Sequence, residues 1–241
     1  MALPKIDVPI YEIELPVSKK KIKYRPFLVK EQRNLLMAME SSEASTIQQS
    51  VRDILYNCTL TEGIDIEKLP IIDVEYYFIN LRAKSVGEVI ESRYRCNNEV
   101  DEVECGNIME KEINLLEIKV QSNDEVSPEI QLDSKLSIKL KYPEFSVIKD
   151  SLRYDNINEV TFNMIANSIE YIYDGEQFYY GHEAQPNEML EFVEGMNQEQ
   201  FAKVENFFNN LPKLKETLDI TCSKCGFQHK IDVEGLESFF V

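Results

Sequence analysis

The sequence lacks tryptophan and has only two histidines and eight glycines among its 241 residues. Histidine is the commonest general base in enzymes, and only His182 and His229 could serve as one here. We expect His182, beside Glu183, to be a loop residue. None of the glycine-, serine- or histidine-based motifs of nucleotide-binding and hydrolytic enzymes occurs. The sequence therefore predicts a protein that is not an enzyme.

Long apolar runs are also absent. No stretch of about 18 apolar residues is present, so we expect no transmembrane helix. The first residues, Met-Ala-Leu-Pro-Lys-Ile-Asp-Val, do not place a basic segment before an apolar one, and we expect no secretory signal. Five cysteines, two of them at metal-ligand spacing, then indicate a reducing cytosol.

Positive charge is scarce: the chain has 26 basic and 43 acidic residues, and its net charge is −17. Binding to a phosphate backbone depends on lysine and arginine, so the charge argues against nucleic acid as a partner. The basic residues cluster at one place, between Lys19 and Arg25. They alternate with apolar residues, which favours a solvated strand face or edge over a patch for nucleic acid or for an acidic protein.

Two cysteine pairs are the most informative feature that is present. Cys222-Ser-Lys-Cys225-Gly226 has the form of a metal-binding knuckle, in which glycine supplies the positive φ of a tight turn. Cys96 and Cys105 are followed by Gly106 and flanked by strand-forming residues. Four thiolates from two hairpins are typical of a structural zinc site. We therefore predict Zn²⁺ bound by Cys96, Cys105, Cys222 and Cys225, which would serve folding and not catalysis.

Other interpretations of the cysteines stay open. Eight residues separate Cys96 from Cys105, which fits a degenerate site as well as a metal site. A disulfide or redox pair at Cys222 and Cys225 is disfavoured, because residues 227–233 alternate like a strand where a redox motif would begin a helix. His229 could replace a ligand, but the alternation favours a solvent-facing residue. Cys58 lies in an apolar helical pattern and is expected to be buried.

Hydrophobic periodicity predicts an α+β fold with an N-terminal β-hairpin, helices packed on small mixed or antiparallel sheets, and a split zinc-ribbon-like cysteine module. Strands are expected at 10–15, 21–25, 88–95, 108–115, 129–132, 136–142, 216–221 and 227–233. Helices are expected at 29–40, 44–60, 74–86, 144–152, 156–173, 187–195 and 198–210. Asp73 and Gly87 are the expected caps of the third helix, and residues 64–69 an extended link.

We expect residues 1–241 to form a single unit. Its sub-parts are 1–122 with the hairpin, helices and first cysteine pair, 123–212, which is mainly helical, and 213–241 with the second pair and an apolar tail. The polar turn at 123–128 is the best internal boundary. The aromatic-rich residues 169–180 favour core or hairpin packing over a ligand platform.

Several segments together carry a resemblance to a known family. They are the opening hairpin with Arg25-Pro26-Phe27, the stretch Arg82-Ala-Lys84-Ser85-Val-Gly87, the split cysteine pairs, and the ending Gly235-Leu-Glu-Ser-Phe239-Phe240. The chain resembles the baseplate hub assembly proteins of T-even-like contractile-tailed bacteriophages. The resemblance implies a non-enzymatic, chaperone-like factor that binds hub and tape-measure proteins in the infected bacterial cytoplasm, as part of a hetero-oligomer, and need not remain in the virion.

Two alternatives to an assembly factor remain. One is a permanent structural subunit of the baseplate or tail, which would stay in the virion; the other is a redox or metal-dependent enzyme that uses Cys222 and Cys225. The phenylalanine pairs 207–208 and 239–240 are candidate apolar surfaces for a partner, although core packing is more typical of such pairs. The tail from Gly235 either docks on the core or is a peptide that binds a partner.

Overall fold

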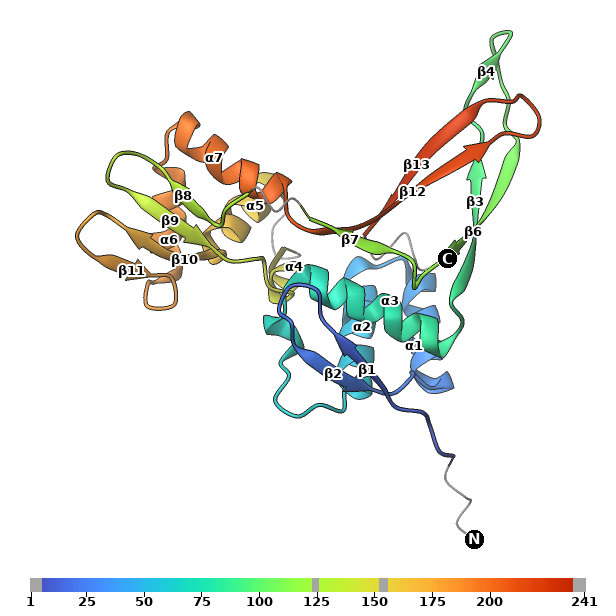
Figure 1. Ribbon diagram of the computed structural model, residues 1–241, viewed down its shortest axis with the longest axis horizontal. Helices are drawn as coiled ribbons and strands as arrows, with labels where there is room; N and C mark the ends of the chain where they lie inside the picture. Colours follow the sequence, from blue (N-terminus) through green and yellow to red (C-terminus); the bar gives the residue numbers. More distant parts are fainter. Residues whose placement is uncertain (1–5, 123–125, 152–155, 236–241) are drawn as a thin grey trace.

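The computed structural model describes residues 6–122, 126–151 and 156–235, and it has the α+β fold that the sequence predicts. Figure 1 shows three parts. The helical part (residues 6–86) starts with the N-terminal hairpin, and the ribbon part (87–121 and 213–235) rises on one side of it. The mixed lobe (126–212) lies on the other side. Among the described residues, no helix is long and apolar enough to cross a membrane.

The helical part follows the predicted periodicity closely. Its elements are β1 (Tyr11–Glu14), β2 (Lys21–Tyr24), α1 (Val29–Ser41), α2 (Ala44–Cys58), the 3₁₀ helix η1 (Ile66–Lys68) and α3 (Ile71–Ser85). Strands β1 and β2 pair antiparallel, with Ile13 opposite Ile22. Alternation along β2 buries Ile22 and Tyr24 and leaves Lys21 and Lys23 exposed, so the basic cluster is a solvated strand face as expected.

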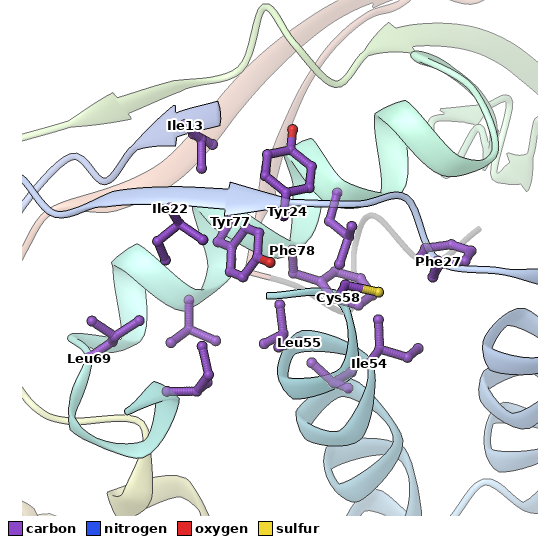
Figure 2. Packing of buried hydrophobic residues seen from close by; sticks show 14 of the residues in the cluster. Ile13, Ile22, Tyr24, Phe27, Ile54, Leu55, Cys58, Leu69, Tyr77 and Phe78 are labelled. Carbon is purple, nitrogen blue, oxygen red and sulfur yellow. The ribbon is translucent and has the colours of Figure 1, made fainter. Parts of the chain in front are cut away.

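One hydrophobic core joins these elements. Figure 2 shows side chains from the hairpin, α2 and α3 gathered in it, among them Ile22, Tyr24, Leu55, Cys58, Tyr77 and Phe78. Tyr77 and Leu81 of α3 are fully buried, and Phe78 is 1% exposed. The rings of Tyr24 and Tyr77 meet edge to face at 5.4 Å. Cys58 is completely buried, which confirms its prediction as a core residue.

The structure corrects both ends of the third helix. Helix α3 begins at Ile71 after Pro70, and Asp73 lies inside its first turn. The buried Asp73 carboxylate accepts hydrogen bonds of 2.8 Å from the backbone N–H groups of Val17 and Ser18. It therefore ties the β1–β2 loop to the helix instead of capping the helix. At the other end the C-cap is Val86, not Gly87.

The link at 64–69 is also not extended throughout. The Asp65 side chain accepts a hydrogen bond from the N–H of Glu67 and starts the 3₁₀ turn η1. Short polar side chains such as that of Asp65 stabilise such turns locally. The alternation of apolar and polar residues in this segment suggested an extended chain instead.

The ribbon part consists of strands. They are β3 (Val89–Arg95), β4 (Glu99–Val100), β5 (Val103–Glu104), β6 (Ile108–Asn114), β7 (Lys119–Gln121), β12 (Lys213–Thr221) and β13 (Gln228–Glu234). Strand β3 pairs with β6 along seven residues, and β12 pairs with both β13 and β7. A second core covers one face of these ribbons, and it includes Ile72, Ile79 and Ala83 of α3. Helix α3 therefore packs on both cores.

The mixed lobe places a four-stranded sheet among its helices. Its elements are β8 (Glu129–Gln131), β9 (Ser137–Leu140), α4 (Ser146–Ser151), α5 (Ile157–Asn167), β10 (Ile169–Tyr173), β11 (Phe178–Tyr180), α6 (Pro186–Glu194) and α7 (Gln198–Asn209). The sheet order is β11-β10-β9-β8. The helix predicted over 156–173 is wrong beyond Asn167, because residues 169–173 form β10 and pair with β9, with a register irregularity between Ile169 and Tyr171.

The structure describes one of the two phenylalanine pairs that were candidate apolar surfaces. Phe207 is 4% exposed in the core of the mixed lobe, and the partly buried Phe208 packs against the same cluster. This confirms core packing for that pair. Phe239 and Phe240 lie outside the described residues, as does the tail beyond Gly235.

Candidate metal centre

The second cysteine pair forms a tight knuckle between β12 and β13. The N–H of Cys222 donates to the carbonyl of Phe227 at 2.8 Å, and the N–H of Gly226 donates to the carbonyl of Cys222 at 2.8 Å. Gly226 has φ +74°, a value that favours glycine. These two bonds bend the chain so that the sulfurs of Cys222 and Cys225 lie close to the same point.

The first pair repeats this geometry. The N–H of Cys96 donates to the carbonyl of Asn107 at 2.8 Å, the N–H of Gly106 donates to the carbonyl of Cys96 at 3.0 Å, and Gly106 has φ +62°. The bonds and the glycine match those of the second knuckle one for one. The two pairs are therefore two copies of one local structure.

An inserted hairpin explains the wide spacing of the first pair. Strands β4 and β5 pair antiparallel, and the turn between them has positive φ at Asp101 and Glu102. The N–H of Cys105 donates to the carbonyl of Asn98 at 2.8 Å and closes the base of this hairpin. Without residues 99–104 the segment would read Cys-Asn-Asn-Cys-Gly, which is the pattern of the second knuckle.

The two knuckles bring four sulfurs together. Cys96 Sγ lies 3.6 Å from Cys225 Sγ, and Cys105 Sγ lies 3.8 Å from Cys222 Sγ. All four sulfurs lie within 4.8 Å of one another. A tetrahedral zinc with Zn–S bonds of about 2.3 Å has sulfur–sulfur edges of about 3.8 Å. The arrangement therefore fits one metal ion, and the separations are far longer than the roughly 2 Å bond of a disulfide.

Burial and hydrogen bonding also suit a metal. Cys96, Cys105 and Cys222 are buried, and Cys225 is partly exposed. The Asn107 side-chain amide donates to Cys222 Sγ at 3.5 Å, and the Asn98 amide donates to Cys225 Sγ at 3.7 Å. Two asparagines of the first knuckle, Asn98 and Asn107, thus each contact a sulfur of the second. Four thiolates this close would repel one another strongly without a cation between them.

Hydrogen bonds and burial act in opposite directions on two of the thiols. The backbone N–H of Cys225 donates to Cys222 Sγ and, with that of Lys224, lowers the pKa of Cys222 to about 6 although burial raises it. Burial dominates at Cys96 and raises its pKa to about 12, while the N–H of Asn98 lowers it. Asn98 and Lys224 hold the same position in the two knuckles, so the donor pattern repeats as well.

His229 is the residue that the sequence interpretation misplaced. It lies on the partly buried face of β13, with its Nε2 3.2 Å from Cys96 Sγ. The prediction that it faces solvent is wrong, because the inward face of β13 carries residues 229, 231 and 233. Four sulfurs are enough for a tetrahedral site, so His229 would contact Cys96 from outside the ligand set. Strand alternation, followed back from buried Val233, could have found it.

The centre links segments that are far apart in the chain. Cys96 and Cys225 are 129 residues apart, and the Lys224 ammonium adds a 2.9 Å hydrogen bond to the carbonyl of Cys105. Figure 1 shows the β3–β6 and β12–β13 ribbons converging at their far ends. Four protein sulfurs around a metal leave no open position for substrate. Such a centre would hold the two ribbons together and would not be catalytic.

Two further sequence motifs, residues 25–27 and 82–87, also contact each other. The N–H of Phe27 donates to Ser85 Oγ at 3.0 Å, which joins Arg25-Pro26-Phe27 to the end of α3. Arg25 forms a 3.0 Å ion pair with the buried carboxylate of Glu31. Burial raises the pKa of Glu31, but hydrogen bonds from Arg25 and from the N–H of Leu28 outweigh it and leave the pKa lowered. These residues fix the turn into α1.

Comparison with known proteins identifies a family. A family model described as T4 bacteriophage base plate protein matches residues 8–241. No curated protein and no solved structure matches the chain. The matched region includes both knuckles, the mixed lobe and residues 8–86 of the helical part.

Proposed function

Because the chain belongs to the T4 bacteriophage base plate protein family, we propose that it is a non-enzymatic assembly factor for the base plate hub. In this proposal it binds hub or tape-measure proteins in a hetero-oligomer, in the host cytoplasm, while the tail is built. The family match over residues 8–241 carries the base plate part of the proposal.

Exposed apolar side chains support the assembly part. A chaperone-like protein needs apolar surface that its partner can cover. Leu36 and Met37 of α1 are 51% and 61% exposed, and Phe178 in the mixed lobe is 50% exposed. The net charge of −17 would oppose self-association of the uncomplexed protein.

An assembly factor and a permanent structural subunit differ in whether the chain is present in the finished virion. We expect co-expression with hub and tape-measure proteins to yield a stoichiometric complex by native mass spectrometry. Quantitative mass spectrometry of purified virions should then find the chain absent. A fixed copy number in virions would instead favour a permanent structural subunit, and no complex with either protein would contradict both roles at the hub.

We further propose that Cys96, Cys105, Cys222 and Cys225 bind one structural Zn²⁺. The sulfur–sulfur distances near 3.8 Å support this assignment. Native mass spectrometry should find one zinc per chain, and each Cys→Ser change in this set should abolish it. The matched control is Cys58→Ala, which alters a buried thiol outside the set and should keep the metal. Zinc retained after all four changes would refute the site.

A further inference from the structure

The sheet of the mixed lobe has one packed face and one open face. Its pairing aligns Ile130, Ile138, Ile172 and Tyr179 in a row across the four strands. Ile138 and Ile172 of this row are buried in the core of the lobe. Because side chains alternate along a strand, the rows on either side belong to the opposite face. That face carries two rows, Glu129, Lys139, Tyr171, Tyr180 and Gln131, Ser137, Tyr173, Phe178.

Aromatic rings gather on the open face beside β11. We call Tyr171, Tyr173, Phe178 and Tyr180 the aromatic row. The Phe178 ring lies 4.6 Å from Tyr173, 5.1 Å from Tyr171 and 6.2 Å from Tyr180, centroid to centroid. Phe178 and Tyr180 are 50% and 42% exposed. This is an unusual amount of contiguous aromatic surface to leave in water, and it marks an interaction site.

Strand β11 is also an open edge of the sheet. The N–H of Gly181 donates to the carbonyl of Glu170, so hydrogen-bonded pairs alternate from there and include Tyr179 with Ile172. The N–H and carbonyl of Phe178 therefore point away from β10. Among the described residues, no strand pairs with this outer side. The strand Phe-Tyr-Tyr has no lysine or proline, the residues that usually guard an edge.

The other edge of the same sheet is guarded. The Lys203 ammonium of α7 donates to the carbonyls of Gln131 and Leu132, at 3.2 and 3.1 Å, beside the edge strand β8. The contrast within one sheet singles out β11 as the edge left available for a partner.

Charge identifies the kind of partner. Residues 123–212 hold 17 acidic and 6 basic residues, which accounts for most of the net charge of −17. Glu129 and Glu170 lie near the aromatic row, where Tyr171 Oη donates to Glu129 and Lys139 pairs with Glu170. Lys139 already places its ammonium over the Tyr171 ring, 5.8 Å from the centroid. The surface therefore suits further cations over aromatic rings and repels nucleic acid.

We propose that an extended, positively charged segment of a partner protein adds to the sheet as a strand along β11, with lysine and arginine side chains over the aromatic row. Main-chain hydrogen bonds to Phe178 would supply affinity, and the stacked cations would supply specificity. The inference stands apart from the assembly role, since a permanent base plate subunit could use the same edge.

The test measures binding of a labelled synthetic peptide, Lys-Thr-Arg-Val-Lys-Thr-Arg, by fluorescence anisotropy, with backbone amide shifts by NMR. We expect binding to shift the amides of β11 and to weaken at least about tenfold in Phe178→Lys and in Tyr180→Lys. The matched control is Tyr56→Lys, which changes a tyrosine 44% exposed on α2 and should bind as the wild type. Thermal unfolding of each variant checks that it is folded.

Three further probes separate the parts of the proposal. The same peptide with its central valine replaced by proline keeps the charge but loses a ladder N–H, so it should bind more weakly. An acidic peptide with glutamate at each basic position, and an oligothymidylate, should not bind. Equal binding by the proline peptide, preference for the acidic peptide or the oligonucleotide, unchanged binding by both β11 variants, or no binding of the basic peptide would overturn the proposal.

Discussion

The core of the helical part and the core of the ribbon part lie on two sides of α3 and differ in what stabilises them. On one side of α3, Tyr77, Phe78 and Leu81 pack into a core that also takes side chains from the hairpin and from α2. On the other side, Ile72, Ile79 and Ala83 meet ribbons whose strands bury every second residue at most. The first core buries aromatic rings, whereas the second includes Cys96, Cys105 and Cys222 among its buried residues.

This difference follows from how much surface each part can cover. Helices around a hairpin bury side chains from several directions, and the hydrophobic effect then suffices. Beyond the short pairing of β7 with Lys213–Lys215 each ribbon has two strands, and a two-stranded hairpin is marginal on its own. The ribbons extend beyond α3 in Figure 1, and at their far ends the four sulfurs meet. A metal there would stabilise what burial cannot.

Removing the proposed zinc should distinguish the ribbon part from the helical part most strongly. Metal binding to four thiolates contributes on the order of 10 kcal/mol to the folded state of small zinc modules. Treatment with a chelator should remove hydrogen-exchange protection from β3, β6, β12 and β13. The amides of α1, α2 and α3 should keep theirs. Equal loss in both parts, or no loss in either, would contradict the division.

Truncating an aromatic ring in the core of the helical part should lower stability there and leave the metal site intact. Phe78→Ala leaves a cavity in the helical part and should lower the free energy of unfolding by about 3–5 kcal/mol. Zinc content should not change, because Phe78 lies on the face of α3 away from the ribbons. Denaturant unfolding and metal analysis of the same samples measure both effects.

The matched control for this variant is Leu36→Ala, at a position 51% exposed on α1, which should cost within about 0.5 kcal/mol. A folded Phe78→Ala protein that had lost its zinc would show that the two parts are not separately stabilised.

Acid should weaken the helical part through Glu31. The pKa of Glu31 is lowered in the folded state from the ordinary value of 4.5, so the unfolded chain binds more protons as the pH falls. The contribution of Glu31 is complete above about pH 4.5 and is lost below it. Stability measured between pH 7 and pH 3 should show this loss in the wild type.

In Glu31→Gln that part of the pH dependence should disappear, and stability at pH 7 should fall by about 1–3 kcal/mol, because Arg25 loses its charged partner. The control is Glu14→Gln, which removes an exposed carboxylate of a 3.9 Å pair. An unchanged pH profile in Glu31→Gln would refute this role of the Arg25 pair.

Deleting residues 99–104 should have the smallest effect, and it tests how closely the two knuckles correspond. The deletion removes the β4–β5 hairpin and joins Asn98 to Cys105, so that both knuckles have the same spacing. We expect one zinc per chain and a change in unfolding free energy of less than about 1 kcal/mol. Loss of the metal would mean that the hairpin positions the sulfurs.

Local patterns predicted most of the elements, and contacts between distant segments decided the rest. The hairpin and the first two helices follow from period-two and helical spacing. Asp73 was misassigned because its hydrogen-bond donors, Val17 and Ser18, lie more than 50 residues away. Residues 169–173 contain apolar residues at both periods, and pairing with β9 selected the strand.

The candidate centre was predictable in its residues but not in its geometry. Cys222 and Cys225 were identified from knuckle spacing, and Cys96 and Cys105 from the strand-forming residues that flank them. The sequence offered no sign that residues 99–104 fold as a separate hairpin unless the turn at Asp101 and Glu102 is recognised. The contact of His229 with Cys96 depends on how two distant ribbons meet. The open edge of β11 likewise depends on the sheet order.

In the proposed centre, two matching knuckles share one metal ion through four sulfurs. X-ray absorption at the zinc edge of the purified full-length protein measures this coordination. We expect four sulfur neighbours at about 2.3 Å and no nitrogen neighbour. Three sulfurs with one nitrogen would put His229 in the place of a cysteine, and a protein that binds no zinc would contradict the shared centre altogether.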